Sequence, residues 1–154
     1  MKIAIFEDSA VYYLPYRFLL EEIFSNQNLE IDLYISEDEY TARGKEKTYE
    51  LTLVDHNLAG NSLGSKVIEN MKQDYESRGL RLPKMLGVGS NNPQNYIVNL
   101  GGYALGKPIA FPDFDGTDSE KKSLYLDLDQ DYIVEAKEAL VALFNVEVDE
   151  GKFK

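Results

Sequence analysis

The sequence contains no cysteine, and this absence excludes disulfides, zinc–thiolate sites and thiol nucleophiles. It contains a single histidine, His56, so we expect neither a histidine-based metal site nor a histidine-dependent catalytic triad. No apolar run approaches the roughly 20 residues of a membrane-spanning helix. The first apolar run is also too short for a signal peptide. We therefore expect a cytoplasmic protein.

Basic residues are also scarce in this chain. It carries 16 lysines and arginines against 27 acidic residues, which gives a formal net charge of −11. This excess of negative charge argues against direct binding to nucleic acid or to an anionic membrane surface. Many of the acids lie in residues 30–50 and 113–131, which we interpret as solvated loops and helix surfaces.

The chain has 154 residues, of which 44% are hydrophobic, and these values are typical of one globular domain. Apolar runs of strand length alternate with segments of helical periodicity. The predicted strands are 2–6, 31–35, 51–54, 84–88 and 103–106, and the predicted helices are 9–25, 36–47, 65–75, 93–100 and 132–144. Such alternation predicts a parallel sheet covered on both faces, with right-handed crossovers.

Two parts of this pattern are less regular. Pro15 lies inside the first predicted helix, and an interior proline loses a hydrogen bond and clashes with the preceding turn. We therefore expect that helix either to begin near Pro15 or to be kinked there. Residues 111–130 form a long acidic segment before the last helix, and we assign neither a helix nor a strand to it.

Polar side chains follow four of the predicted strands at the point where each strand ends. The carboxyl ends of parallel strands meet at one edge of a sheet, where open α/β folds place their chemistry. We therefore expect three carboxylates, a hydroxyl and an ammonium to converge at that edge. These residues are Glu7 and Asp8 after the first strand, Asp55 after the third, Ser90 after the fourth and Lys107 after the fifth.

This set of groups suits a hard cation and a phosphoryl group. Two adjacent carboxylates, Glu7 and Asp8, repel each other and favour a cation such as Mg²⁺, which prefers oxygen ligands. A carboxylate beside Mg²⁺, here Asp55, can act as a nucleophile toward phosphorus and form an aspartyl phosphate. The metal offsets the repulsion between that carboxylate and the phosphoryl oxygens. Lys107 can pair with Asp55 or with a phosphoryl oxygen.

Each of these residues also has an ordinary structural interpretation. Acidic pairs usually lie on surfaces, and an aspartate at a strand end often caps the next turn. Lysine followed by proline, as at Lys107, is common in loops, and His56 is most simply a loop residue after a strand. The occurrence of all these groups in order, at successive strand ends, favours the functional interpretation.

In this order the motifs resemble the receiver domain of bacterial two-component response regulators, over residues 1 to about 110 and the last helix. The resemblance implies a flavodoxin-like α/β fold, a doubly wound five-stranded parallel sheet in the order 2-1-3-4-5 with helices on both faces. It implies that Mg²⁺ is held by Glu7, Asp8, Asp55 and the backbone carbonyl of Asn57. It also implies that Asp55 accepts a phosphoryl group and that Lys107 is the cation after the fifth strand.

The same resemblance implies a phosphorelay function. Asp55 would receive its phosphoryl group from a histidine kinase or a histidine phosphotransfer protein. Because the chain ends soon after the last helix, we expect a stand-alone receiver whose output passes to a downstream partner protein. Receivers catalyse only their own phosphorylation and dephosphorylation, so we do not expect an enzyme in the usual sense. The alternative is a pseudo-receiver, an interaction module that works without phosphorylation.

Several positions depart from the receiver pattern. The serine or threonine that follows the fourth strand in receivers falls on Gly89 or on Ser90, and we expect Ser90 to supply the hydroxyl. The aromatic residue of the fifth strand is displaced to Tyr103 or replaced by Ala104. An acidic insertion at about 111–130 precedes the last helix. The output surface is therefore expected to be less typical than the phosphorylation site.

The motif Asp113-Phe114-Asp115-Gly116-Thr117 also matches the loop of haloacid dehalogenase phosphatases, in which the first aspartate is a nucleophile and the second a general acid. However, Pro112 lies where the preceding strand would end. The chain after Thr117 is also too short for the other catalytic strands. We therefore prefer an Asp-Gly turn.

A second acidic motif has the spacing of a calcium-binding loop. Asp127, Asp129, Asp131 and Glu138 match ligand positions of such a loop, but Tyr132 occupies the position that requires glycine. Acidic residues at the start of a helix explain this motif better, because they interact favourably with the helix dipole.

Overall fold

The computed structural model describes residues 1–89 and 95–152, with side chains described as far as Phe144. The chain forms two compact units. The first unit consists of residues 1–9 and 27–106, and the second of residues 10–26 and 107–154. The sequence-based expectation of one domain stays a prediction.

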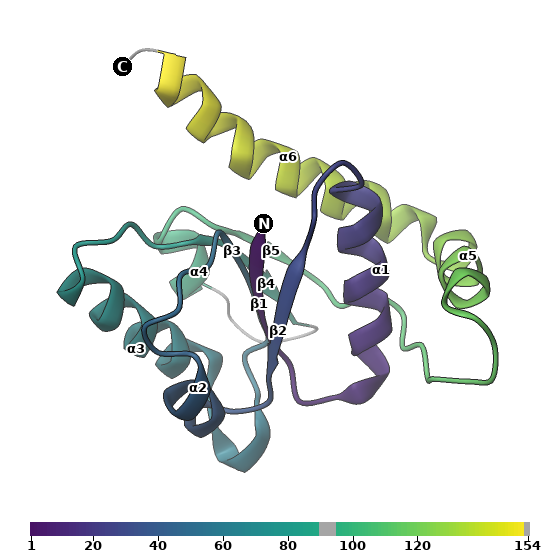
Figure 1. The fold of residues 1–154 in the computed structure, drawn as a ribbon, viewed down its shortest axis with the longest axis horizontal. Coiled ribbons are helices and arrows are strands. Elements are labelled where there is room, and N and C mark those ends of the chain that lie inside the picture. Colours follow the sequence, from purple (N-terminus) through teal and green to yellow (C-terminus); the bar gives the residue numbers. More distant parts are fainter. Residues whose placement is uncertain (90–94, 153–154) are drawn as a thin grey trace. The chain divides into compact units, whose positions relative to one another are not determined.

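The first unit contains a sheet of five parallel strands in the order β2-β1-β3-β4-β5 (Figure 1). The strands are β1 (Lys2–Phe6), β2 (Glu30–Tyr34), β3 (Leu51–Val54), β4 (Lys84–Val88) and β5 (Tyr103–Leu105). The predicted flavodoxin-like α/β fold and strand order are confirmed. All five predicted strands are present, each within one residue of its expected ends.

Burial explains why the central strands are almost wholly apolar. Successive side chains of a strand point to opposite faces of the sheet. Residues 3–6 of β1 and 51–54 of β3 are all buried, so both faces of the sheet are shielded from water. A parallel sheet buried on both faces needs apolar residues at every position rather than at alternate ones. The edge strand β2 is only partly buried, as its alternating pattern predicts.

Within its described residues the first unit has three helices, and they pack on one face of the sheet. They are α2 (Glu37–Arg43), α3 (Gly64–Ser77) and α4 (Asn95–Asn99). The core that they share with the sheet includes Phe6, Val54, Val67, Met71 and Ile97. Ser36 caps α2, because its side chain accepts a hydrogen bond from the Glu39 N–H at 3.1 Å. The helix predicted over 36–47 is therefore present, although shorter.

Four buried tyrosines distinguish this core: Tyr34, Tyr40, Tyr49 and Tyr75. The Tyr34 ring stacks on Phe6 with centroids 5.2 Å apart and meets Tyr40 edge-on at 5.5 Å. The Tyr49 hydroxyl donates to Asp32 Oδ2 at 2.6 Å and also bonds to the Tyr34 hydroxyl. Burial raises the pKa of Tyr40, Tyr49 and Tyr75, so these phenols stay neutral in the folded protein.

The second unit contains a 3₁₀ turn, η1 (Ala10–Tyr12), and the helices α1 (Tyr13–Ile23), α5 (Asp118–Leu128) and α6 (Gln130–Lys152). Because α1 begins at Tyr13, Pro15 lies in its first turn, where the missing N–H is not needed by the helix. The first of the two alternatives for Pro15 is therefore correct. Helix α6 includes the predicted helix 132–144 and extends beyond both of its ends.

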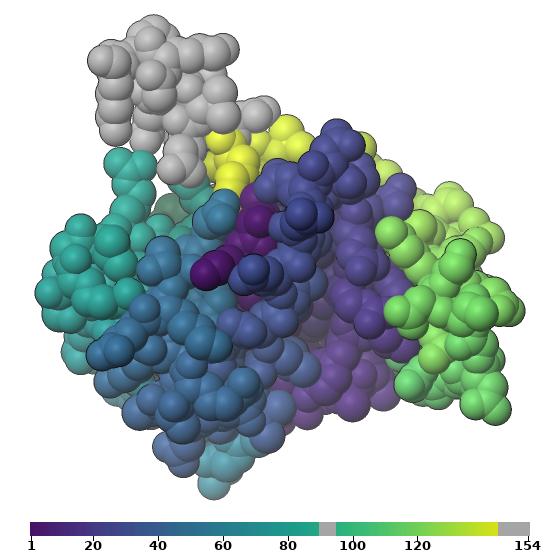
Figure 2. Space-filling view, viewed as in Figure 1, coloured from purple at the N-terminus to yellow at the C-terminus, as the bar shows by residue number. Residues whose placement is uncertain are grey.

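Helix α5 lies within the acidic segment 111–130, where the sequence analysis assigned no helix. Its start is a capping box: Thr117 Oγ1 accepts from the Glu120 N–H at 3.1 Å, and Glu120 Oε1 accepts from the Thr117 N–H at 3.3 Å. Tyr125 is fully buried, and Asp118 bonds to Arg17 of α1 at 3.0 Å. Figure 2 shows this segment in green at the surface, where residues 112–120 are all exposed.

None of the helices in the described part of the chain combines the length and the apolar character that crossing a bilayer requires.

Candidate functional site

Three predicted site residues lie together at the carboxyl edge of the sheet. Glu7, Asp8 and Asp55 each offer a carboxylate oxygen, and these oxygens lie within 4.8 Å of one another. Glu7 and Asp55 are buried, with exposed fractions of 0% and 4%, whereas Asp8 is exposed. The expectation that these carboxylates converge is therefore met.

The pairing of β1 with β3 brings Glu7 and Asp55 together. Phe6 lies opposite Val54 in the parallel register, so the chain leaves both strands at the same level. The Asp55 N–H donates to the Phe6 carbonyl at 2.9 Å, and the Glu7 N–H donates to the Tyr34 carbonyl at 3.0 Å. These hydrogen bonds extend the ladder one residue beyond the strands and hold both backbones in place.

The charge of this cluster favours a cation. Burying carboxylates close to one another is unfavourable unless opposite charge compensates them. The Ser9 N–H donates a hydrogen bond to Glu7 Oε2 at 3.3 Å, so this buried carboxylate has a backbone donor as one of its partners. Mg²⁺ binds oxygen at about 2.0–2.1 Å, so two of its ligands lie at most about 4.2 Å apart. Oxygens within 4.8 Å reach that spacing by small side-chain rotations, and the donor set suits a hard divalent cation.

The loop after β3 has a regular internal structure. The Leu58 N–H donates to the Ser62 carbonyl at 2.9 Å, and Asn57 forms an antiparallel bridge with Leu63. The Ala59 N–H donates to the Ile35 carbonyl at 2.9 Å, which ties this loop to the end of β2. Asn57 lies two residues after Asp55 in this loop, and its role as a carbonyl ligand stays a prediction.

A residue that sequence analysis did not identify, Tyr96 of α4, lies beside Asp55. Gly64, which has no Cβ, lies next to both. A Cβ built at this position would be 2.8 Å from the Tyr96 hydroxyl oxygen and closer still to the Asp55 carbonyl oxygen, so both oxygens lie close to Gly64. Burial, and then the negative charge of Asp55, raise the pKa of Tyr96 to about 12. The Tyr96 ring also lies 5.8 Å from that of His56, between centroids. No motif in the sequence marks Tyr96, because α3 and α4 bring these groups together only in the folded chain.

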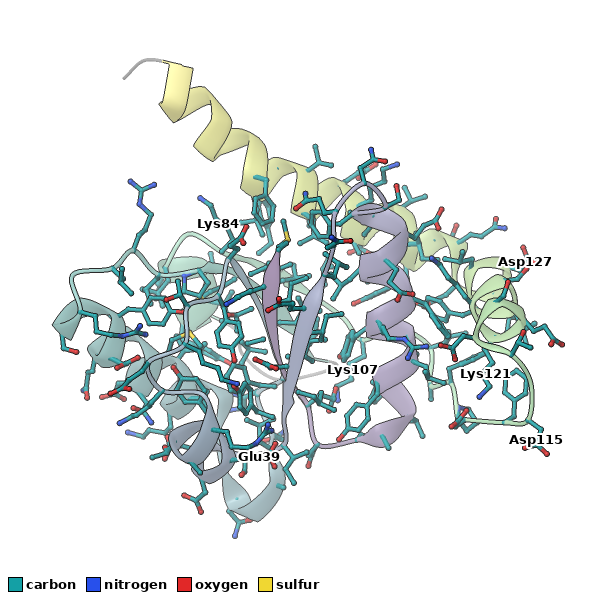
Figure 3. The ribbon with its side chains drawn as sticks, viewed as in Figure 1. Glu39, Lys84, Lys107, Asp115, Lys121 and Asp127 are labelled. Atoms are coloured by element: carbon teal, nitrogen blue, oxygen red, sulfur yellow. The ribbon has the colours of Figure 1, made fainter. Side chains whose placement is uncertain are left out.

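Two further predicted site residues are Lys107 and Ser90. Lys107 belongs to the second unit, where its Nζ lies 4.4 Å from the centroid of the Tyr12 ring; Figure 3 labels this lysine beside α1. Its pairing with Asp55 stays a prediction. Ser90 lies outside the described residues. Gly89 directly follows β4, and its N–H donates to the Leu105 carbonyl at 3.1 Å. On β5, both Tyr103 and Ala104 are exposed.

The phosphatase-like motif has no strand before it, since residues 106–114 form neither strand nor helix. Asp113 pairs with Lys121 of α5, and this ammonium lowers the pKa of Asp113. Asp115 lies at the outer edge of the same loop (Figure 3). Both aspartates line a shallow surface recess of about 260 Å³ together with Lys121. A loop aspartate with its own lysine partner is not placed as a nucleophile at a strand end, so this alternative is not supported.

The calcium-loop motif also has a structural explanation. Asp129 is buried, and its Oδ2 accepts hydrogen bonds from the Tyr125 hydroxyl at 2.9 Å and from the Ile109 N–H at 3.1 Å. It therefore joins α5 to the segment after β5. Asp131 lies in the first turn of α6, where a negative charge is favourable.

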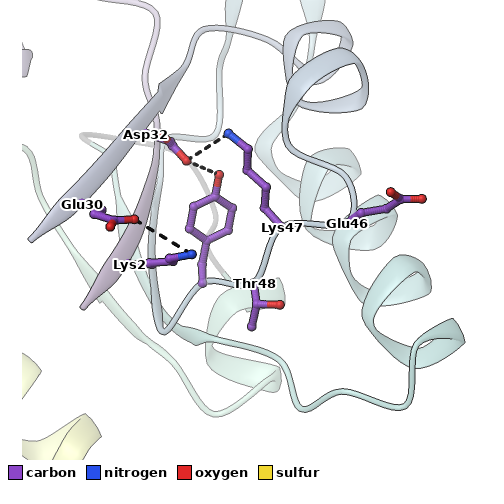
Figure 4. Close-up of a pocket in the computed structure, with 7 residues that line it drawn as sticks. Lys2, Glu30, Asp32, Glu46, Lys47 and Thr48 are labelled. Atoms are coloured by element: carbon purple, nitrogen blue, oxygen red, sulfur yellow. Dashed lines mark hydrogen bonds and ion pairs between the residues drawn. The ribbon is translucent and has the colours of Figure 1, made fainter.

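A second recess, of about 440 Å³, lies at the opposite, amino-terminal edge of the sheet (Figure 4). Four of the five charged residues that line it pair with one another. Lys47 Nζ lies 3.4 Å from Asp32 Oδ2, and Lys2 Nζ lies 4.0 Å from Glu30 Oε2. These pairs are largely exposed, and such ion pairs contribute little to stability or to binding. We therefore assign no function to this recess.

No protein-family model matches the sequence, and no curated protein matches it. Solved structures do share its fold. A CheY-like response regulator receiver domain from Methylobacillus flagellatus is 19% identical, with 71% of this chain and 87% of that chain covered and a TM-score of 0.54. The receiver domain of a sensor histidine kinase from Pseudomonas aeruginosa, described with a magnesium ion in its active-site cleft, is 15% identical, with 82% and 94% covered and a TM-score of 0.53.

A third similar structure is described as belonging to a family of redox sensors in the streptococci that evolved from two-component response regulators. It is 13% identical, with 99% of this chain and 55% of that chain covered and a TM-score of 0.59. At such identities the likeness concerns the fold, which agrees with the strand order. The chain therefore has the fold of a CheY-like response regulator receiver domain.

Proposed function

We propose that this protein is a phosphorelay receiver that accepts a phosphoryl group on Asp55. The observation that carries the proposal is the cluster of Glu7, Asp8 and Asp55, whose oxygens lie within 4.8 Å of one another at the carboxyl edge of a receiver-type sheet. Carboxylates are gathered there at an energetic cost, and a metal-assisted reaction at phosphorus is a reason to keep them there.

In the proposed reaction, a carboxylate oxygen of Asp55 attacks the phosphorus of a phosphohistidine. A P–O bond forms and the P–N bond breaks, and its electron pair stays on the leaving imidazole nitrogen. Glu7, Asp8, Asp55 and the Asn57 carbonyl would hold Mg²⁺, which when bound neutralises charge on the phosphoryl oxygens. Lys107 is the cation proposed to pair with the phosphoryl group.

The phosphoryl donor in this proposal is a histidine kinase or a histidine phosphotransfer protein, and the output passes to a protein partner. The expected cytoplasmic location is part of the same proposal. The chain acts as a switch rather than as an enzyme on a separate substrate, because the group that it phosphorylates and dephosphorylates is its own carboxylate.

The second candidate function is a pseudo-receiver, which binds a partner without being phosphorylated. One observation favours it: Gly89, which has no hydroxyl, directly follows β4. The redox sensors mentioned above also indicate that descendants of response regulators can serve other functions.

Intact mass spectrometry after incubation with Mg²⁺ and acetyl phosphate distinguishes the two functions. We expect the wild type to gain one phosphoryl group and the D55N variant to gain none. The exposed Asp115 provides a control, since the D115N variant should be modified like the wild type. A wild type that stays unmodified with acetyl phosphate and with phosphoramidate would support the pseudo-receiver instead.

A further inference from the structure

The Tyr96 hydroxyl is a buried polar group for which the described residues, 1–89 and 95–152, provide no hydrogen-bond partner. Buried hydroxyls are almost always paired, because leaving one unpaired costs the hydrogen bonds that it would make in water. An exception calls for an explanation, and a partner that arrives only in one state of the protein is such an explanation.

The position of this hydroxyl indicates where that partner would be. The site at which a Gly64 Cβ would stand lies 2.8 Å from Tyr96 Oη, 2.9 Å from Val54 Cγ1 and closer still to the Asp55 carbonyl oxygen. Any side chain at position 64 would therefore separate the phenol from the end of β3. The glycine keeps this space open, and the hydroxyl lies near the backbone carbonyl oxygen of Asp55, the residue that carries the carboxylate.

The electrostatic environment favours a donor there. A tyrosine phenol, with an ordinary pKa near 10, keeps its proton at neutral pH. It can therefore donate a hydrogen bond but adds no negative charge to a site that already holds three carboxylates. A neutral donor is the group that an incoming anion on Asp55 would need.

We propose that the Tyr96 hydroxyl donates a hydrogen bond to the phosphoryl group carried by Asp55, so that α4 responds directly to phosphorylation. This inference rests on the proposed function of Asp55. It assigns to a residue of α4 the hydroxyl contact that Gly89, directly after β4, cannot make.

The attachment of α4 to the sheet provides a route for the response. Ile97, the residue after Tyr96, is buried, and its carbonyl accepts a hydrogen bond from the Gly102 N–H at 2.9 Å, just before β5. Val98 follows Ile97 and is 53% exposed. A displacement of Tyr96 would therefore move a short helix that is attached to the sheet through Ile97. The same helix presents the apolar side chain of Val98 to solvent.

The test compares beryllofluoride binding, with Mg²⁺, by the wild type and three single variants, since beryllofluoride mimics a phosphoryl group on an aspartate. We expect Y96F to bind at least about tenfold more weakly, because a hydrogen bond to a charged group is lost. Tyr40 is a matched control, since its hydroxyl is also buried without a partner and lies within the tyrosine core. Y40F should bind within about twofold of the wild type.

The third variant, S90A, tests the serine expected from the sequence. Equal affinity of Y96F and the wild type, with weaker binding by S90A alone, would overturn the inference for Tyr96. A direct readout is the NMR signal of Tyr96 in protein with ¹³C-labelled tyrosine rings, assigned by its absence in Y96F. We expect its Cζ signal to shift on adding beryllofluoride, and an unmoved signal would contradict the inference.

The two proposals fail in different ways. A wild type that neither binds beryllofluoride nor gains a phosphoryl group would refute the function proposed for Asp55, and the role of Tyr96 with it. A wild type that is phosphorylated while Y96F binds beryllofluoride equally well would refute only the role of Tyr96.

Discussion

Phe6 and Val54 lie opposite each other on the neighbouring parallel strands β1 and β3, and this pairing places Glu7 beside Asp55. The two carboxylates are far apart in the sequence and come from separate strand ends. Each is the residue directly after its strand, and each continues the hydrogen-bond ladder through its own N–H. The sheet therefore fixes the backbone positions of both residues.

The first prediction concerns metal binding at this site. Replacing Asp8 by alanine removes one of the three carboxylates proposed as ligands, so we expect Mg²⁺ affinity to fall by roughly tenfold or more. Without metal, the same change relieves repulsion and should raise the melting temperature. Titration calorimetry and thermal unfolding measure the two effects. The control is D115A, which changes an exposed aspartate outside the cluster and should keep the Mg²⁺ affinity of the wild type. Equal Mg²⁺ affinity of D8A and the wild type would place the metal elsewhere.

The second prediction concerns Gly64 at the start of α3. A Cβ there would collide with backbone and with Val54, so G64A should lose about 1–3 kcal/mol of unfolding free energy. Urea denaturation measures this loss. Gly106 is the matched control, because a Cβ at that position meets nothing within 4 Å and G106A should be neutral or slightly stabilising. Equal stability of G64A and G106A would show that the close approach is not maintained in solution.

The third prediction concerns the start of α5. T117A removes the side-chain acceptor of the capping box and should cost about 1 kcal/mol of helix stability. Hydrogen exchange should become faster at the amides of the first turn of α5. The S123A variant changes an exposed residue inside the same helix and should leave that exchange unchanged. Unaltered protection in T117A would mean that tertiary contacts alone hold this turn.

The fourth prediction concerns alkaline pH. Burial raises the pKa of six tyrosines above the ordinary value near 10, and that of Tyr96 reaches about 12; the other five are Tyr40, Tyr49, Tyr75, Tyr125 and Tyr132. Above pH 10 the unfolded chain loses phenol protons that the folded chain retains. The contribution of these phenols to the free energy of unfolding should therefore be constant below about pH 10 and be lost as the pH rises further.

Chemical denaturation at pH 8 and at pH values between about 10 and 12 tests this expectation. The absorbance of tyrosinate near 295 nm should rise in two parts. Exposed tyrosines ionise in the folded protein, whereas the buried phenols ionise only when the chain unfolds. Equal stability at pH 8 and 11 would contradict the shifted pKa values.

Sequence reasoning identified the strands well because their signals are local. Each run of apolar residues is followed within two residues by a polar one, and a parallel sheet buried on both faces leaves little choice of arrangement. The convergence of Glu7, Asp8 and Asp55 followed from that topology. Helix α5 was missed because its cap, Thr117 with Glu120, lies among many acids. Its exposed Leu124 and Leu128 also blur the apolar stripe by which a helix is recognised.

The amino-acid sequence by itself therefore determined the sheet, the order of its elements and the carboxylates at its edge, since periodicity and strand ends depend on neighbouring residues. Only the tertiary structure decided the contacts between distant segments. The tyrosine core around Tyr34 is one example, and the approach of Tyr96 to Asp55 across Gly64 is another. Such contacts depend on the way in which α3 and α4 pack on the sheet, and packing leaves no periodic mark on the residues that meet.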